Sequence, residues 1–339
     1  MNMSNWVDSL IHSGAKQSMP ILSFPCCQLM DIDVEQLLSS SGKMAEGMRL
    51  VADRADSCAQ VSFMDLSVEA ECFGSKVVFR SGEVPTVVGS IVCCEKDADD
   101  LKVPALTHRA PVCVEAMRLA SSYIEKPVFA GMIGGFSLAG RLVGVTEAMI
   151  NCYEEPHMMH KVLAKCTDFL ISYAKAFKST GVNGIIIAEP LTGLLSPELA
   201  LEFSTPYIKA ITDAVQDEEF IIIYHNCGNS VVKIMDTILQ TGCKGYHFGN
   251  AVDMRGVLKL IPSNVLVMGN VDPASEFLNG TPESIRQTTK KLLTDCSKYA
   301  NFIISSGCDI PPLTPWANID AFFAAVAEFY RYNGNKVQS

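Results

Sequence analysis

The feature of this chain that most constrains its fold is a regular alternation of short apolar runs with longer amphipathic segments. The short runs are rich in β-branched residues, and the longer segments repeat apolar residues at the i, i+3 and i+4 spacing of helices. The predicted strands are 20–24, 60–64, 128–131, 184–188, 220–224, 244–248, 265–268 and 302–305. The predicted helical segments are 34–51, 112–124, 158–177, 197–215, 231–239, 254–261, 282–298 and 318–330.

Eight strands that are each followed by a helix predict an α/β fold, the TIM (β/α)₈ barrel. A doubly wound open sheet is less favoured, because neither a G-x-G-x-x-G pattern nor a P-loop follows any predicted strand. We expect one domain, 1–339, with an N-terminal extension and an insert at 65–109 that forms a hairpin over the barrel mouth. Ser196 and Thr281, each followed by proline and glutamate, predict helix starts.

The composition excludes several classes of partner. Lys and Arg number 27 against 37 acidic residues, and a net charge of −10 argues against a nucleic-acid-binding surface. We expect no membrane association, because the chain contains no run of about 18 apolar residues and does not begin with a signal-peptide pattern. The 13 cysteines, an odd number scattered through apolar segments, are typical of a reducing compartment, so we expect a cytoplasmic protein.

The functional residues of a TIM barrel lie at the carboxyl ends of its strands, and three side chains there predict a metal site. His225 and Cys227 are two residues apart, so that they project to the same side of an extended strand end, and Cys308 follows the last strand. One imidazole and two thiolates suit zinc with a fourth position open to substrate. The alternative is a core histidine beside an ordinary buried cysteine; the glycine after the Cys227 turn and the barrel context favour the metal site.

The same segments resemble those of the uroporphyrinogen decarboxylase superfamily and, within it, the methylcobamide:coenzyme M methyltransferase branch. The resemblance covers nearly the whole chain, and the segments that carry it are 65–74, 130–137, Glu189-Pro190, 225–229, 269–273, 306–311 and Asn318. It implies a TIM barrel and zinc held by His225, Cys227 and Cys308. It also implies a methyl donor, a methylcorrinoid (cobalamin) on a separate corrinoid protein, and a small thiol acceptor such as coenzyme M that attacks as a zinc-bound thiolate.

The chain departs from the family pattern in two places. The decarboxylases carry an arginine-bearing segment after the first strand, whereas residues 23–29 here contain no cation, which disfavours porphyrinogen decarboxylation. The family glycine-proline after the third strand reads Gly134-Gly135, which we expect to loosen a loop of the mouth. The alternatives that stay open are a decarboxylase-like lyase, methyl transfer to tetrahydrofolate, and a non-catalytic corrinoid or thiol binder with structural zinc.

Four carboxylates complete the predicted site. Glu189 is the predicted catalytic residue, which receives or orients the thiol proton, and the alternative is that it caps a turn. Asp65 and Glu69 are predicted to contact substrate, unless they begin a solvated helix. Asp272 is predicted to hydrogen-bond substrate, although Asp-Pro is also a common turn former. His247, at the end of the sixth strand, is the nearest candidate to complete the metal shell, but the favoured interpretation is a barrel residue whose hydrogen bonds are satisfied within the protein.

Overall fold

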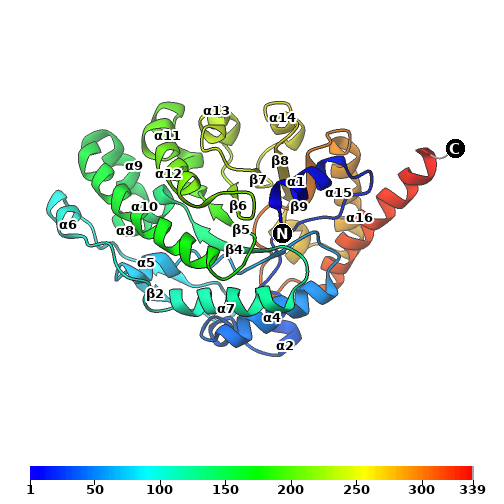
Figure 1. The fold of residues 1–339 in the computed structure, drawn as a ribbon, viewed down its shortest axis with the longest axis horizontal. Coiled ribbons are helices and arrows are strands. Elements are labelled where there is room, and N and C mark those ends of the chain that lie inside the picture. Colours follow the sequence, from blue (N-terminus) through cyan, green and yellow to red (C-terminus); the bar gives the residue numbers. More distant parts are fainter. Residues whose placement is uncertain (338–339) are drawn as a thin grey trace.

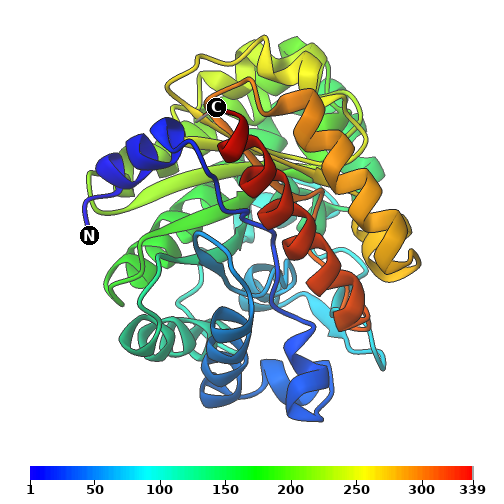
Figure 2. The same ribbon diagram turned by 90° about the vertical axis from the view of Figure 1, so that its right-hand side faces the viewer.

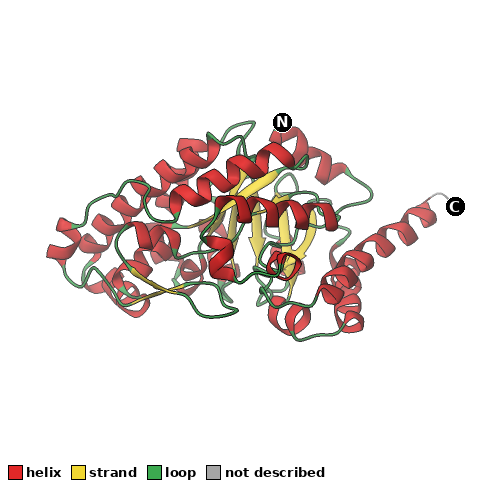
Figure 3. Cartoon of the chain, turned by 90° about the horizontal axis from the view of Figure 1, so that it is seen from below, coloured by secondary structure: helices red, strands yellow, loops and turns green. Residues whose placement is uncertain are grey.

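Seven parallel strands form the curled sheet at the centre of the molecule, in the order β1-β4-β5-β6-β7-β8-β9 (Figure 3). The structure is a computed structural model that describes residues 1–337. The strands are β1 (Gln60–Val61), β4 (Val128–Ile133), β5 (Gly184–Ala188), β6 (Ile221–Asn226), β7 (Gly245–Phe248), β8 (Leu266–Val271) and β9 (Phe302–Ser306). The predicted TIM-barrel fold is confirmed.

The first predicted strand, 20–24, differs from the prediction, because this stretch is not a regular strand. The chain at 18–22 nevertheless lies between β9 and β1: the Met19 N–H donates to the Ile304 carbonyl at 3.0 Å, and Ser18 forms a parallel bridge with Ser57. Proline at position 20 has no N–H to donate, and the Ile21 N–H goes to the Ser306 hydroxyl at 3.0 Å instead of to a backbone carbonyl. The eighth position is therefore filled by a segment with an interrupted ladder.

Helices surround the sheet in an outer layer (Figure 1). Side-chain oxygens of Ser196 and Thr281 accept from Leu199 and Ser284 backbone N–H groups, which confirms both predicted helix starts. The α-helices of the outer layer and the insert are α2 (Cys26–Met30), α3 (Val34–Leu38), α4 (Ser41–Arg54), α5 (Val68–Cys72), α6 (Glu95–Asp100), α7 (Ala110–Tyr123), α8 (Gly135–Val143), α9 (Val145–Glu154), α10 (Pro156–Lys178), α11 (Pro197–Phe203), α12 (Thr205–Val215), α13 (Met235–Leu239), α14 (Met254–Leu258), α15 (Pro282–Cys296) and α16 (Trp316–Val337). Short 3₁₀ or π turns are η1 (Pro190–Leu194), η2 (Val231–Ile234) and η3 (Pro273–Leu278).

Alternate residues of each strand face the two sides of the sheet. On β6, Ile221 and Ile223 belong to the barrel interior, whereas Ile222 and Tyr224 pack against the outer helices. The N-terminal extension forms α1 (Met3–His12), which lies beside the sheet (Figure 2) and packs its apolar face into that interior cluster. The Met3 N–H donates to the Glu218 carbonyl just before β6, so α1 covers the amino end of the barrel and leaves the carboxyl end for the site.

The insert at 65–109 contains the hairpin β2 (Lys76–Val78) and β3 (Thr86–Val88). Gly82 in its turn lies beside Leu313, which follows β9, since a Cβ added at Gly82 would meet the Leu313 Cδ1 atom at 3.3 Å. This contact with a loop at the carboxyl end supports the prediction that the insert lies over the mouth. No helix among the residues described is both long and apolar enough to cross a membrane.

Candidate metal centre

Three potential metal ligands converge at the carboxyl end of the barrel. His225 continues the inward-facing positions 221 and 223 of β6, Cys227 follows two residues later, and Cys308 comes from the loop after β9. Their ligand atoms all lie within 4.8 Å of one another, and among the residues described they are the one such His, Cys, Asp or Glu group. His225 is buried and both cysteines are half-buried. The structure thus brings together the three predicted ligands.

The geometry of this group fits zinc. Two ligands at usual Zn–N and Zn–S lengths and at the tetrahedral angle are separated by roughly 3.6 Å. The Nε2 atom of His225 and the Sγ atom of Cys308 are 3.5 Å apart. An imidazole and two thiols are also the donor set that zinc prefers over magnesium or calcium. Both cysteines are partly exposed, so protein does not fully enclose this group.

The two thiols influence each other's ionisation. A hydrogen bond with Cys308, helped by one with His225, lowers the pKa of Cys227 and outweighs the effect of burial. The same contact with Cys227, together with burial, raises the pKa of Cys308. The pair therefore favours one thiolate before any metal binds, and a cation would be needed to stabilise both as thiolates.

His247 contacts the imidazole of His225, and Ser305 contacts His247. His225 and His247 are paired in register on β6 and β7, and their Nδ1 atoms are 2.8 Å apart. The Nε2 atom of His247 lies 2.7 Å from the Ser305 hydroxyl, which donates to the Met19 carbonyl at 2.7 Å. Burial lowers the pKa of His247 well below its usual value. The interpretation of His247 as hydrogen-bonded within the barrel agrees with these contacts, but its contact with a candidate metal ligand was missed.

Glu189 is buried at the end of β5 and faces the start of α8. Its two carboxylate oxygens accept from the Phe136 N–H at 3.1 Å and the Ser137 N–H at 2.6 Å. Gly134 permits this approach, because a Cβ there would lie 2.2 Å from the Glu189 Oε2 atom. Burial raises the pKa of Glu189 to about 7 against the lowering effect of these N–H groups. The side chain thus caps a neighbouring helix, while its pKa suits a proton acceptor at neutral pH.

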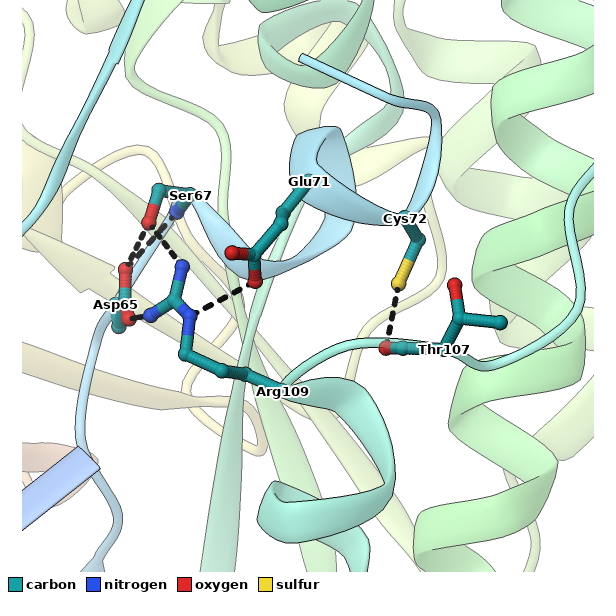
Figure 4. A network of polar contacts seen from close by, with 6 residues as sticks. All are labelled: Asp65, Ser67, Glu71, Cys72, Thr107 and Arg109. Carbon is teal, nitrogen blue, oxygen red and sulfur yellow. Dashed lines mark hydrogen bonds and ion pairs between the residues drawn. The ribbon is translucent and has the colours of Figure 1, made fainter. Parts of the chain in front are cut away.

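Asp65 lies in a network of polar contacts centred on Arg109 (Figure 4). Arg109 pairs with Asp65 and Glu71, the latter at 2.8 Å, and donates to the Ser67 hydroxyl at 2.9 Å. Burial raises the pKa of Asp65, and the Arg109 guanidinium opposes this. Sequence reasoning missed Arg109, which is 44 positions further along the chain.

Glu69 is fully buried near the end of β4. Its Oε1 atom accepts from the Ile133 N–H at 3.0 Å, and its Oε2 atom has no hydrogen-bond partner among the residues described. Burial raises the pKa of Glu69 to about 7. A carboxyl group with one free oxygen and this pKa can hold a proton at neutral pH.

Asp272 caps the turn η3 after β8. Its Oδ1 atom accepts from the Ala274 and Ser275 N–H groups, and its Oδ2 atom accepts from the Asn250 amide at 2.8 Å. Partial burial raises the pKa of Asp272, but the two N–H groups outweigh this and lower it. None of the four predicted carboxylates belongs to the His-Cys-Cys group that the described residues form.

Comparisons with known proteins agree with this fold. The profile of the uroporphyrinogen decarboxylase family (URO-D) matches residues 15–329. The methylcobamide:CoM methyltransferase MtbA of Methanosarcina acetivorans is 29% identical over 341 residues, covering 94% of this chain and 96% of the relative. MtbA of Methanosarcina mazei is 32% identical over 279 residues, covering 79% of this chain and 78% of the relative.

A solved structure described as a methyltransferase from Methanosarcina mazei has a TM-score of 0.85, with 22% identity, and covers 97% of this chain and 99% of that one. At this identity the likeness concerns the fold. The profile match, which spans most of the chain, confirms the resemblance that the sequence motifs indicated. The chain belongs to the uroporphyrinogen decarboxylase family.

Proposed function

We propose that this protein is a zinc-dependent methyltransferase, which moves a methyl group from a methylcorrinoid on a corrinoid protein to a thiol acceptor such as coenzyme M. The observation that carries the proposal is the convergence of His225, Cys227 and Cys308 at zinc-ligand spacing, with both cysteines partly exposed. The similarity to two methylcobamide:CoM methyltransferases over at least 79% of the chain supports it. We place the protein in the reducing cytoplasm, which the 13 free cysteines favour.

The three ligands would hold the metal and set its charge. Bound zinc would supply the positive charge that lets an acceptor thiol lose its proton near neutral pH. Cys227 and Cys308, as thiolates, and a neutral His225 would balance the charge of the ion, so that the acceptor sulfur would keep its nucleophilicity. Methyl transfer would form a bond from the acceptor sulfur to the methyl carbon while the cobalt–carbon bond of the donor breaks, and the electron pair of that bond would leave with the corrinoid. We propose Glu189, with its raised pKa, as the group that accepts the thiol proton, and Asp65, Glu69 and Asp272 as substrate contacts.

The loops around the site offer a docking surface for the corrinoid protein. Leu194, Val232 and Leu313 are apolar side chains on the segments that follow β5, β6 and β9, and they are 60%, 44% and 64% exposed. Large apolar side chains exposed around one opening favour a protein contact. We propose that the partner covers this end of the barrel and so brings the methylcobalt carbon to the acceptor sulfur.

The segment after position 22 argues against the decarboxylase alternative. Gln28 donates to the carbonyls of Pro312 and Thr314, both at 2.8 Å, so its amide is used to tie this segment to the loop after β9. Residues 23–29 offer no cation for a substrate carboxylate.

The test combines metal analysis with a cobalamin assay. We expect about one zinc per chain and a thiol-dependent conversion of methylcobalamin to cob(I)alamin, both lost in Cys308→Ala. Cys296→Ala, at a fully buried cysteine of α15, is the matched control and should keep both. Turnover with tetrahydrofolate but with none of the thiols would show that tetrahydrofolate, and not a thiol, is the methyl acceptor. The proposal would be overturned if no acceptor supports turnover and X-ray absorption shows four protein ligands on the zinc, unchanged when thiol is added. Such a result would favour a structural zinc.

A further inference from the structure

Four buried groups form a series that leads from the candidate metal site to the segment at 18–22. The contacts run from His225 Nδ1 to His247 Nδ1 at 2.8 Å, from His247 Nε2 to Ser305 Oγ at 2.7 Å, and from Ser305 Oγ to the Met19 carbonyl at 2.7 Å. All four residues are at most 2% exposed, so water does not compete for these contacts. The two imidazole rings meet edge to face, at 70°.

The proton positions in this series follow from its fixed end. A backbone carbonyl only accepts, so Ser305 must donate its single hydroxyl proton to Met19. Ser305 therefore accepts from His247, which places the proton of His247 on Nε2. A hydrogen bond between the two Nδ1 atoms at 2.8 Å needs one donor and one acceptor, and with its proton on Nε2 the His247 Nδ1 atom supplies the lone pair. That lone pair accepts from His225, whose proton is thus on Nδ1.

We propose that His247 and Ser305 are positioning residues, which hold His225 in the tautomer and orientation that present its Nε2 lone pair to the metal. This inference rests on the proposed metal site. The opposite tautomer of His225 would set two lone pairs against each other at 2.8 Å and would turn an N–H toward Cys308 Sγ, 3.5 Å from Nε2. A ligating histidine is commonly fixed by a hydrogen bond at its other ring nitrogen, usually to a carboxylate, a carbonyl or water. Here a second, neutral imidazole takes that place.

The series ends at the Met19 carbonyl, in the segment that closes the barrel. Met19 donates its N–H to the Ile304 carbonyl of β9, and its own carbonyl accepts from Ser305 of the same strand. Closure of the barrel between β9 and β1 thus sets the proton on His247. Where the ladder at 18–22 is interrupted, the Met19 carbonyl thus accepts from a side chain of β9 instead of from its backbone.

The direct test leaves the sequence unchanged. In protein labelled with ¹⁵N-histidine and loaded with zinc, long-range ¹H–¹⁵N correlation spectra report which ring nitrogen carries each proton. We expect His225 protonated at Nδ1 and His247 at Nε2, with both protons protected from exchange. A proton on His247 Nδ1 would overturn the assignment. Activity does not enter this measurement.

The second test measures zinc affinity by competition with a chelator. We expect Ser305→Ala and His247→Phe to weaken zinc binding by about 10–100-fold and to alter the spectrum of the cobalt(II)-substituted protein. His247→Asn, which keeps an acceptor near His225, should restore part of the affinity. Ser306→Ala is the matched control, because Ser306 is equally buried on the same strand but its hydroxyl accepts from the Ile21 N–H, whereas the hydroxyl beside His247 is that of Ser305.

The outcomes separate this inference from the function on which it rests. If the wild-type protein binds no zinc, the metal site fails and the positioning role falls with it. If the wild-type protein binds zinc and His247→Phe binds it equally tightly, only the positioning role is overturned. An equal loss of affinity in Ser305→Ala and Ser306→Ala would also overturn it, because the effect would then follow from disturbing β9 in general.

Discussion

Replacing Arg109 with methionine tests the network at the start of the insert. Arg109 is 12% exposed, and it pairs with Asp65, whose side chain is 3% exposed, and with Glu71, at 21%. Methionine preserves the apolar part of the side chain but leaves the Asp65 carboxylate buried without its counter-charge. Removing one partner from a buried ion pair costs about 3–5 kcal/mol in the free energy of unfolding. We expect Arg109→Met to lose an amount in this range at pH 7.

The loss in the free energy of unfolding that Arg109→Met causes depends on pH. Burial already raises the pKa of Asp65 in the wild-type protein, and loss of the opposing guanidinium raises it further. A carboxyl group whose folded-state pKa lies above its unfolded value costs no stability when it is protonated, and the cost grows as pH rises toward the folded-state pKa. The difference in stability between Arg109→Met and wild type should therefore be largest at pH 7 and shrink toward pH 4, where Asp65 is increasingly protonated.

Urea unfolding followed by circular dichroism at several pH values measures both effects. The matched control is Arg118→Met on α7, where Arg118 pairs with Glu115 at 57% and 44% exposure; the expected loss is small, because solvent screens an exposed ion pair. Asp65→Asn in the Arg109→Met background should recover part of the loss, because it removes the unpaired charge. A loss in Arg109→Met that equals the control, or that grows on acidification, would refute the reasoning.

Two further variants address catalysis and docking. Glu189→Gln places an amide NH₂ against two backbone N–H donors and leaves one of them unpaired, so we expect a loss of about 1–3 kcal/mol in the free energy of unfolding. If Glu189 also accepts the thiol proton, the methyl-transfer rate of this variant no longer depends on pH near 7. An unchanged pH profile in the zinc-loaded variant would leave Glu189 with only its role as a helix cap. Leu194→Ser with Leu313→Ser should slow transfer from a corrinoid protein while transfer from free methylcobalamin stays at the wild-type rate, and equal slowing with both donors would contradict a docking role.

The strand pattern could be predicted well where strands are buried on both faces and poorly where their ends carry polar residues. The predicted run 184–188 coincides with β5, whose five residues are all buried and mostly isoleucine. The predicted run 220–224 stops before His225 and Asn226, which the structure includes in β6. Apolar periodicity does not detect a polar residue that points into a barrel and finds a partner there. The last two residues of β6, which include the candidate ligand His225, are therefore the part that the pattern misses.

The candidate ligands could be found from sequence because their spacing is local and their chemistry is distinctive, while their supporting contacts depend on strand register. His225 and Cys227 are two residues apart, and Cys308 belongs to a motif of its own. The link from His225 to His247 requires that β6 and β7 be aligned so that these residues face each other, and the link to Ser305 requires closure of the barrel through β9. One signal was present, since both strands contain a Tyr-His pair, at 224–225 and 246–247.

Gly134 and Glu189 show how two sequence features can be one structural feature. The Gly134-Gly135 pair was interpreted as a departure that loosens a loop, and Glu189 as a separate residue of the mouth. The structure joins them, because Gly134 lacks the Cβ that would lie 2.2 Å from the Glu189 Oε2 atom, and the next turn supplies the N–H groups that hold that carboxylate. A side chain at position 134 would push Glu189 away from its two donors. The glycine thus fixes a buried carboxylate whose pKa lies near 7, and it constrains this part of the mouth instead of loosening it.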